Sequence, residues 1–306
     1  MANEIRYTGI GDLTLAEVLH KEALLLLADR TSLRNHPAIV DLGMINAAGS
    51  TVEQVPQIGL DGYDNMATLA GESTAISNTA LTDAWSTITV AEQGLAYEMS
   101  DVARMVDALS VLNGPRFAAS IFRSAMVTFS EVIAKVGDGF AASAGTTTEA
   151  YDVDVMFEGN FALEQALVPG PYLRVLKPKS YTDWVDSMRA EGGWVQFQAA
   201  GASMAVLRGP GFKGSFLGCD FVTSDQVQGL NSSADWGNFV FGRGAIGVKE
   251  GVVPPSRSII ELLRAGPILV EEERDAKGRS VSVVGHYPLG AAIIEDARGT
   301  IELGAQ

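Results

Sequence analysis

Residues 115–136 read PRFAASIFRSAMVTFSEVIAKV, and this stretch carries the most regular periodicity in the 306-residue chain. Its large apolar residues recur at steps of four, three, four and three, at Phe122, Met126, Phe129, Ile133 and Val136. Such spacing places apolar side chains on one face of a helix. Pro115 suits the first helical position, and Gly137 favours a helix end. The sequence therefore predicts a helix about 33 Å long, at 1.5 Å per residue, whose apolar stripe packs on a sheet.

An acidic stretch precedes this helix. Residues 39–98 contain eight acidic residues and no Lys or Arg, so they carry −8 of the formal net charge of −15. Two extended segments, 51–58 and 85–91, flank about 26 residues that are rich in Gly, Asn, Asp, Ser and Thr. A loop this long is uncommon in a compact domain and is typical of a segment that lies on a neighbouring molecule. A solvated hairpin is the alternative interpretation.

The remaining elements are expected from periodicity and turn residues. Helices are predicted over Leu15–Arg30, Asp101–Leu109, Glu158–Leu167 and Lys179–Glu191. Strands are predicted over Tyr172–Lys177, Phe216–Thr223, Phe239–Lys249, Ala291–Ile294 and Thr300–Leu303. A hairpin is predicted between Ile268–Arg274 and Arg279–Val284, with Gly278 left-handed in its turn. Pro288 and Gly290 are expected to bend the chain after this hairpin.

Composition excludes several classes of protein. Hydrophobic residues make up 47% of the chain and charged residues 19%, so a sizeable core is expected and general disorder is not. A pI of about 4.6 excludes binding to phosphate backbones by bulk attraction. The single cysteine, Cys219, excludes an internal disulfide and a multi-cysteine zinc site. Residues 1–30 show no export signal and no apolar run of membrane length, so synthesis in the cytoplasm and no membrane association are expected.

The sequence contains no complete motif for catalysis or cofactor binding. The glycine patterns at 209–214 and 242–247 resemble a dinucleotide fingerprint, but neither is followed by the helix that must hold the pyrophosphate. The three histidines are scattered, at His20, His36 and His286, and residues 61–65 lack the ligand spacing of a calcium loop. The sequence therefore predicts no catalytic residue, no cofactor and no metal.

The order of these elements resembles that of the major capsid protein of tailed double-stranded DNA bacteriophages, which has the Hong Kong 97-type fold. The stretch HYPLGAAII at 286–294 is similar to the final axial strand of that family, and EEERDAKGRSV at 271–281 to its charged peripheral loop. The resemblance covers nearly the whole chain. The resemblance lies in the order and spacing of the predicted elements, because the family has no signature peptide.

The resemblance implies an α+β fold divided in a particular way: an N-terminal arm at 1–43, an extended β-hairpin loop at 44–98, a peripheral domain at 99–170 that contains the spine helix 115–136, an axial domain at 171–267, a peripheral hairpin at 268–285 and C-terminal axial strands at 286–306. It implies a structural protein and not an enzyme. Hexamers and pentamers of this protein would form an icosahedral phage head, a virion capsid that encloses DNA without sequence-specific binding.

Two departures from the family affect the expected partners. Some members cross-link through a lysine in the extended loop, but residues 44–98 contain no lysine. Some members begin with a long helical scaffolding segment, and the arm here is too short for one. The implied partners are therefore other copies of the chain, a separate scaffolding protein, a portal protein and, if the shell needs one, a cement protein.

Charge suggests which residues make contacts between subunits. Acidic loops that met would repel one another, so each loop is expected to lie on a less acidic or Arg-bearing surface of a neighbour. The hypothesised assembly residues are Glu53, Asp61, Asp64, Trp85 and Ile88 in the loop, Arg104, Arg116 and Arg123 on or near the long helix, and Arg274, Lys277 and Arg279 in the peripheral hairpin.

Two other classes of protein are also compatible with the sequence. An encapsulin, a bacterial protein compartment with a similar fold, would need a pocket for cargo peptides, which a sequence does not reveal. A cytoplasmic enzyme would need an active site assembled from scattered carboxylates among the 37 acidic residues. Large hollow particles would favour a shell, and a compact monomer or dimer that binds a ligand would favour an enzyme.

Overall fold

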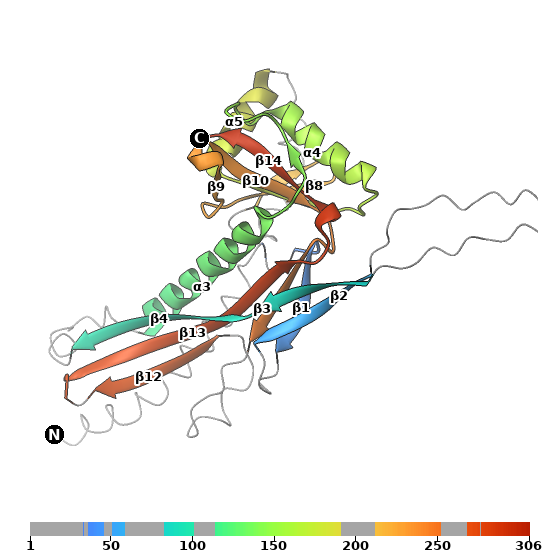
Figure 1. The fold of residues 1–306 in the computed structure, drawn as a ribbon. Coiled ribbons are helices and arrows are strands. Elements are labelled where there is room, and N and C mark those ends of the chain that lie inside the picture. The colour runs from blue at the N-terminus through green and yellow to red at the C-terminus, as the bar shows by residue number, and fades with distance from the viewer. Residues whose placement is uncertain are drawn as a thin grey trace, which may run out of the picture.

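The chain folds into two β-sheets, a separate two-stranded hairpin and three helices within the part that the structure describes (Figure 1). A computed structural model describes residues 33, 36–45, 51–58, 83–100, 114–190, 212–251, 268–275 and 277–306. The predicted helices Leu15–Arg30 and Asp101–Leu109 lie outside these residues. No helix of the described ranges is long and apolar enough to cross a membrane.

The long helix predicted at 115–136 is confirmed as α3, Gly114–Gly137. Of the predicted stripe, Phe129 and Ile133 are buried, and Met126 and Val136 are partly buried and pack against the same core, which Ile121 and Ala125 also join. The side chain of Phe122 is not among those described. Helix α3 packs against strand β13, Ser280–Ile293. The approach is close at Gly285, where a Cβ atom would lie 2.8 Å from Ile121 Cγ2.

The five-stranded sheet is built around β13. Antiparallel β4, Ala91–Ser100, pairs along one edge of β13. Along the other edge lie β12, Leu269–Asp275, and then β11, Ile246–Gly251. The sheet ends with β1, Ile39–Ile45, which runs parallel to β11.

Two expectations about this region were wrong. Strand β13 continues through Pro288 and Gly290 without the predicted bend. Gly290 serves a different purpose, because a Cβ atom there would lie 2.4 Å from the Thr89 carbonyl oxygen. The predicted β12–β13 hairpin is confirmed, but its left-handed residue is Arg279, with φ 53°, and not Gly278. The expected boundary between residues 285 and 286 falls inside this continuous strand.

The seven-stranded sheet has the order β5-β14-β10-β6-β8-β7, and β9 pairs with β10. Its strands are β5 Ser143–Ala144, β6 Tyr172–Leu176, β7 Phe212–Phe216, β8 Cys219–Thr223, β9 Gly229–Leu230, β10 Asp235–Phe241 and β14 Gly299–Ala305. Short 3-10 turns lie at Asn231–Ser233 and Asp296–Arg298.

Two predicted single strands are in fact pairs of strands. Phe216–Thr223 contains a turn at Leu217 and Gly218 that separates β7 from β8. Phe239–Lys249 contains a turn at 242–245, where Gly244 has φ 93°. This second turn carries the chain from β10 in one sheet to β11 in the other.

Helices α4, Val153–Gln165, and α5, Pro178–Ala190, cover one face of the seven-stranded sheet. Helix α5 confirms the prediction, but α4 begins five residues earlier than predicted. The side chain of Asp152 caps it, because its Oδ1 accepts a hydrogen bond from the Val155 amide at 2.9 Å. Trp184 of α5 is fully buried and stacks on Phe221 of β8, with ring centroids 4.6 Å apart.

The other face of this sheet shares a core with α3 and the five-stranded sheet. Phe239 and Phe241 of β10 stack at 5.9 Å, and Phe140 lies 6.5 and 6.4 Å from their centroids. A Cβ atom at Gly299 would lie 2.1 Å from the Phe140 ring, so only glycine fits there.

The two strand connections between the sheets are hydrogen-bonded to each other. The amide of Ile294 donates to the Ala245 carbonyl at 2.7 Å, and the amide of Gly242 donates to the Arg298 carbonyl at 3.0 Å. The Arg298 side chain also donates to the Arg243 carbonyl at 2.9 Å. These residues therefore form one joint between the sheets, which we call the sheet joint (residues 242–245 and 294–298).

Candidate functional site

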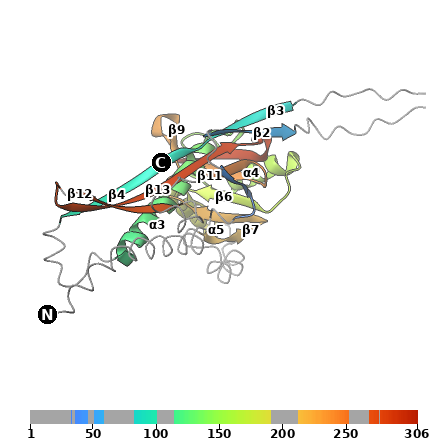
Figure 2. The same cartoon turned by 90° about the horizontal axis from the view of Figure 1, so that it is seen from below.

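The predicted acidic flap begins as a regular antiparallel hairpin. Strand β2, Val52–Ile58, pairs with β3, Asp83–Thr89, in continuous register, as the sequence predicts. The hairpin β2–β3 lies at the opposite end of the molecule from the hairpin β12–β13 (Figure 2). Residues 59–82, which include Asp61 and Asp64, lie outside the described residues.

The inner face of this hairpin is fastened to the body of the same chain. Glu53 of β2 forms an ion pair with Lys249 of β11, whose side chain is only 6% exposed. Ser86 of β3 donates a hydrogen bond to the Ile293 carbonyl of β13 at 2.8 Å. Glu53 therefore already has a partner in its own subunit, which the sequence did not reveal.

Ile88 lies on this same inner face, opposite Glu53, and is completely buried within the chain. The expectation that Ile88 finds its partner on a neighbouring subunit is corrected, because this side chain has no surface left to offer. Trp85 lies on the other face, opposite Pro56, and is 60% exposed. Val52 shares that outer face and is 46% exposed.

The outer face of the hairpin carries no charge over the three residue pairs whose side chains are described. It consists of Val52, Gln54, Pro56, Trp85, Thr87 and Thr89, all of them exposed. An exposed tryptophan on an uncharged strand face is a feature of contact surfaces, where large aromatic side chains contribute most of the binding energy. Of the hypothesised loop residues that the structure describes, Trp85 is the most exposed.

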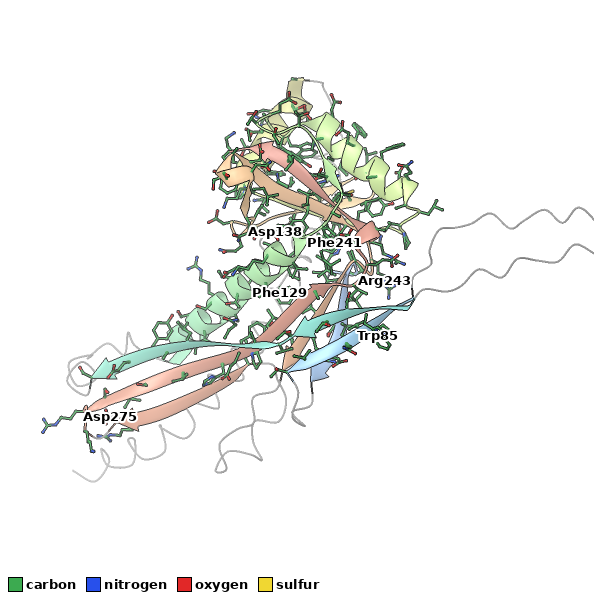
Figure 3. The ribbon with its side chains drawn as sticks, viewed as in Figure 1. Trp85, Phe129, Asp138, Phe241, Arg243 and Asp275 are labelled. Atoms are coloured by element: carbon green, nitrogen blue, oxygen red, sulfur yellow. The ribbon has the colours of Figure 1, made fainter. Side chains whose placement is uncertain are left out.

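The predicted basic residues fall on two elements. Arg274, Lys277 and Arg279 are exposed at the tip of the β12–β13 hairpin, beside Asp275. The Asp275 carboxylate accepts a hydrogen bond from the Lys277 amide at 2.8 Å, which shapes the turn. This tip is the far end of the five-stranded sheet in Figure 3.

The remaining candidates belong to α3 or precede it. Arg123 is exposed on α3, and Arg116 lies in its first turn, where side chains are not described. Arg104 lies outside the described residues. Among the side chains that the structure describes, the ion-pair partner of Glu53 is Lys249 of the same chain.

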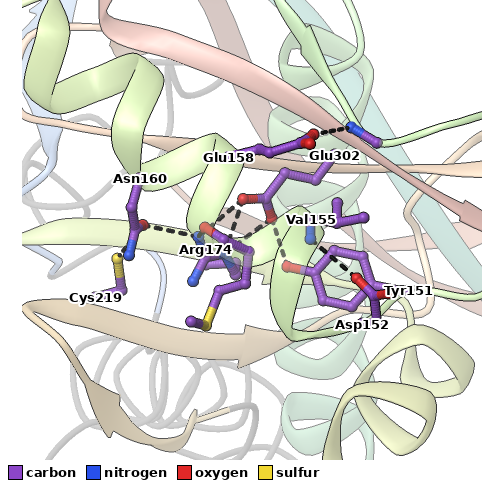
Figure 4. A network of polar contacts seen from close by, with 10 residues as sticks. Tyr151, Asp152, Val155, Glu158, Asn160, Arg174, Cys219 and Glu302 are labelled. Carbon is purple, nitrogen blue, oxygen red and sulfur yellow. Dashed lines mark hydrogen bonds and ion pairs between the residues drawn. The ribbon is translucent and has the colours of Figure 1, made fainter. Parts of the chain in front are cut away.

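A buried polar network, not detected from the sequence, holds the seven-stranded sheet to α4 (Figure 4). Arg174 of β6 and Glu302 of β14 are both fully buried, and Arg174 Nη2 lies 2.8 Å from Glu302 Oε1. The Tyr151 hydroxyl donates to Glu302 Oε2 at 2.7 Å. Arg174 also donates to Asn160 Oδ1 at 2.8 Å, and this oxygen accepts from the Cys219 thiol at 3.0 Å.

The electrostatics of the network follow from burial and from the ion pair. Burial alone would lower the pKa of Arg174, but the Glu302 carboxylate, together with smaller contributions from Tyr151 and Cys219, raises that pKa above its ordinary value. Burial raises the pKa of Glu302, and Arg174 and Tyr151 offset part of this effect. Burial also raises the pKa of the Cys219 thiol to about 11, so the thiol is a poor nucleophile at neutral pH. This matches the prediction of a buried, unreactive cysteine.

Each of the two described histidines contacts a carboxylate group. His36 Nε2 lies 2.8 Å from Asp220, and its Nδ1 accepts the Ala38 amide at 3.1 Å, so the ring fastens the start of β1 to β8. His286 contacts Glu92 across β13 and β4 at 2.7 Å. Among the described residues there is no group of three or more His, Cys, Asp or Glu side chains that could hold a metal ion.

No family model matches the chain, and no curated protein matches its sequence. Solved structures do match it. The capsid of the cyanophage P-SCSP1u matches with a TM-score of 0.56 at 13% identity, over 86% of this chain and 85% of that one. The SrpI encapsulin of Synechococcus elongatus PCC 7942 matches with a TM-score of 0.57 at 11% identity, over 88% and 85%. The capsid of a native GTA particle matches with a TM-score of 0.55 at 13% identity, over 90% of both chains.

At these identities the similarity establishes the fold alone. The matches span most of each chain, so they concern the whole architecture and not one shared motif. The chain therefore has the Hong Kong 97-type capsid fold, a mixed α/β fold that it shares with phage capsids, a GTA capsid and encapsulins.

Proposed function

We propose that the chain is the major capsid protein of a tailed double-stranded DNA bacteriophage, and that hexamers and pentamers of it form an icosahedral head. The observation that carries this proposal is the extent of the fold: four phage capsids match between 82% and 87% of the chain. A protein of this kind works through surfaces that meet other copies of itself, and it needs no active site.

The assignment of the described elements to domains is part of this proposal. In this proposal α3 is the spine helix, and the five-stranded sheet with the β12–β13 hairpin forms the peripheral domain. The seven-stranded sheet with α4 and α5 forms the axial domain, and β2–β3 is the base of the extended loop. This assignment departs from the expected division in three places. Strand β11 belongs to the peripheral sheet, although residues 171–267 are expected to be axial, and so do residues 286–293 of β13, although residues 286–306 are expected to be axial. Helix α4 belongs to the axial domain, although residues 99–170 are expected to be peripheral.

The hairpin β2–β3 supports contact with a neighbour through its outer face. Two-stranded hairpins are marginally stable in water by themselves, so the described base gains its order from the body beneath it. The sequence places 24 residues between Ile58 and Asp83, and Trp85 stands exposed where they begin. We propose that Trp85 and these residues lie on an adjacent subunit, against a surface that bears Arg104, Arg116 or Arg123.

The basic tip of β12–β13 is the second proposed contact. Arg274, Lys277 and Arg279 stand exposed on a chain whose formal net charge is −15. A basic tip is attracted to the acidic surface of another copy, and salt would weaken this attraction because the charges are exposed.

The acidic composition supports a head filled with DNA. A shell of negative charge does not hold an incoming polyanion by phosphate attraction, so DNA is enclosed without specific binding. In this role the protein is part of the virion and is made in the host cytoplasm. Its other proposed partners are a separate scaffolding protein, a portal protein and, where the shell requires one, a cement protein.

An encapsulin-like compartment is the second candidate. It is favoured by the match to the SrpI encapsulin, whose TM-score of 0.57 is as high as the 0.56 found for the cyanophage capsid. Both candidates are shells, and they differ in content. A phage head holds double-stranded DNA, whereas a compartment of this kind holds protein cargo.

Electron microscopy and mass photometry of the purified full-length chain test the proposal. We expect hollow icosahedral particles, or pentamers and hexamers when the chain is expressed without a scaffold. The content of native particles is then examined by nuclease protection and by mass spectrometry. Protected double-stranded DNA supports the capsid, enclosed protein without DNA supports the compartment, and a monomer under all conditions contradicts both.

A further inference from the structure

The outer face of helix α4 carries large apolar side chains. Phe157 and Phe161 are four residues apart, so they are neighbours along the helix, and they are 47% and 65% exposed. The opposite face of α4 already packs on the sheet through Met156 and Leu163, which are completely buried. A helix with only water on its outer face is normally polar there. The two phenylalanines therefore indicate a surface that another molecule covers.

Two exposed leucines extend this surface beyond the end of α4. Leu167 and Leu217 are 56% and 54% exposed, and both have a left-handed backbone, with φ of 54° and 49°. Tyr172 joins the two turns, because its hydroxyl donates to the Val168 carbonyl at 2.9 Å and its amide donates to the Gly218 carbonyl at 3.1 Å. A left-handed backbone is unfavourable for a residue with a side chain, and glycine would avoid the cost. The chain therefore keeps two leucine side chains on this surface at a cost to its own stability.

The charges on this surface are all negative. Residues 151–173 contain four acidic residues and no Lys or Arg, and Asp154, Glu158 and Glu164 are exposed on α4. Glu164 lies in the last turn of α4, where a negative charge opposes the helix dipole. Burial and, to a smaller degree, the Glu164 carboxylate raise the pKa of Tyr172, so this carboxylate lies near the residue that joins the leucine turns. One acid of the surface is thus placed against the preference of its own helix.

The chain does not neutralise these acids with its own basic residues. Asp154 and Glu164 form no ion pair within the part of the chain that the structure describes. The basic residues of the neighbouring helix α5 have acidic partners within one turn of that helix, in the pairs Lys179–Asp183 and Arg189–Asp186. Cations that balance the acidic surface must therefore come from another molecule.

A partner for this surface must supply apolar and basic side chains together. The basic tip of β12–β13 in another copy offers cations, but residues 274–279 contain no large apolar side chain that could cover Phe157 and Phe161. A helix with an apolar stripe between Lys or Arg residues offers both, and it can lie along α4 with its stripe on the two phenylalanines. The 13 residues of α4 are about 20 Å long, which gives such a helix room for several turns of contact.

We propose that the outer surface of α4 binds a basic amphipathic helix of a partner protein. This surface consists of Phe157, Phe161, Glu164, Leu167 and Leu217, and we call it the α4 surface. The apolar stripe of the partner covers the phenylalanines and leucines, and its cations pair with Glu164 and the other acids of the helix. The inference concerns one surface of the single chain, so it can fail while the proposed function holds.

A synthetic peptide tests the α4 surface on the full-length chain. The probe is a fluorescein-labelled helix of about 14 residues, with leucines on one face and lysines on the other, and fluorescence anisotropy measures its binding. A scrambled peptide of the same composition, which has no apolar face, should bind at least about tenfold more weakly. Equal binding of the two peptides would mean that the acidic chain merely attracts lysine, and it would overturn the proposal.

Variants of the α4 surface locate the binding site. Phe157→Ser/Phe161→Ser should weaken binding of the leucine–lysine peptide at least about tenfold. Glu164→Gln should also weaken it, and should reduce its dependence on salt because one charge pair is lost. Val127→Ser is the matched control, because Val127 is 44% exposed on α3 and lies outside the α4 surface, so this variant should bind like the wild type. Equal binding by all of these variants would overturn the proposal.

A leucine variant covers the case in which the serine variant fails to fold. Leu167→Gly/Leu217→Gly places glycine where the backbone is left-handed, so the variant should unfold at the temperature of the wild type or above it. The same variant should bind the leucine–lysine peptide at least about tenfold more weakly, because two apolar contacts are lost. Wild-type binding by the folded leucine variant would contradict the proposed site.

Mass photometry separates the α4 surface from contacts between copies of the chain. Folded Phe157→Ser/Phe161→Ser should form the same assemblies as the wild type. Loss of assembly in this folded variant would assign the α4 surface to a contact between copies and would overturn the proposed partner. A wild type that stays monomeric under all conditions, yet binds the peptide at the α4 surface, would overturn the proposed function and support this inference.

Discussion

Lys249 and Glu53 form an ion pair although they are 196 positions apart, and this pair fastens the base of the β2–β3 hairpin to the five-stranded sheet. The Lys249 side chain is 6% exposed, while the Glu53 side chain is 44% exposed. The pair thus has a buried cation and a partly solvated anion. Loss of the pair therefore leaves Lys249 buried without a partner, whereas Glu53 still contacts water.

Glu53→Gln should destabilise the folded chain by about 1–3 kcal/mol, because it leaves a buried ammonium group without its carboxylate partner. Solvent near Glu53 keeps the effect below that of a fully buried pair. Urea denaturation of the purified chain measures the change. The double variant Glu53→Gln/Lys249→Met should recover most of the lost stability, and no recovery would show that Glu53 acts through another contact.

Trp85 and Ile88 should respond in opposite ways to truncation. Ile88→Ala leaves a cavity in the core and should lower the free energy of unfolding by about 2–5 kcal/mol. Trp85→Ala removes a side chain that is 60% exposed, so it should change subunit stability little and reduce particle assembly. Denaturation of the subunit and particle counts by electron microscopy measure the two effects. Normal assembly of Trp85→Ala would remove Trp85 from the subunit contact.

Glu302→Gln should be among the most damaging polar substitutions. Arg174 and Glu302 are both fully buried, and removal of one partner from a buried pair costs about 3–5 kcal/mol. Glu131→Gln is the matched control, since it breaks the exposed pair with Lys135 on α3, which is worth about 0.3–0.5 kcal/mol. Equal losses in the two variants, measured by chemical denaturation, would contradict a structural role for the buried network.

Stability should decrease at alkaline pH because of Cys219. Burial raises the pKa of its thiol from an ordinary value near 9 to about 11 in the folded chain. The unfolded chain therefore loses this proton first, so the contribution is complete below pH 9 and is lost as the pH rises through 11. The slope approaches about 1.4 kcal/mol per pH unit in this window.

Denaturation midpoints between pH 8 and pH 11 test this expectation. Cys219→Ala should reduce the dependence on pH in that window. Part of it should remain, because burial also raises the pKa of Tyr151 well above its ordinary value. An unchanged pH profile in Cys219→Ala would show that the thiol does not cause the loss.

Apolar repeats, alternation and turn residues predict the helices and strands whose signals lie within a short stretch of sequence. Helix α3 has a long apolar repeat, and the strands β2, β3 and β12 have turn residues or alternation beside them, so all of these were found. The start of α4 was missed because its signal is a single capping residue, Asp152, ahead of a weakly periodic stretch.

Features that depend on distant residues were not predictable. Arg174 and Glu302 are 128 positions apart, and nothing near either residue in the sequence indicates the pairing. The same reason explains the errors at Gly290 and Ile88. Gly290 looked like a bend but allows close approach of Thr89, and Ile88 looked like a contact for a neighbour but is covered by its own subunit.

In the proposed shell, the sheet joint would have a mechanical consequence. Strand β13 is 14 residues long and is braced by strands on both edges and by α3, so it resists flexing along its length. A change of angle between the two sheets is therefore concentrated where the chain crosses from one to the other. Residues 242–245 and 294–298 would act as the hinge that lets one polypeptide occupy both flatter and more steeply tilted positions in a closed surface.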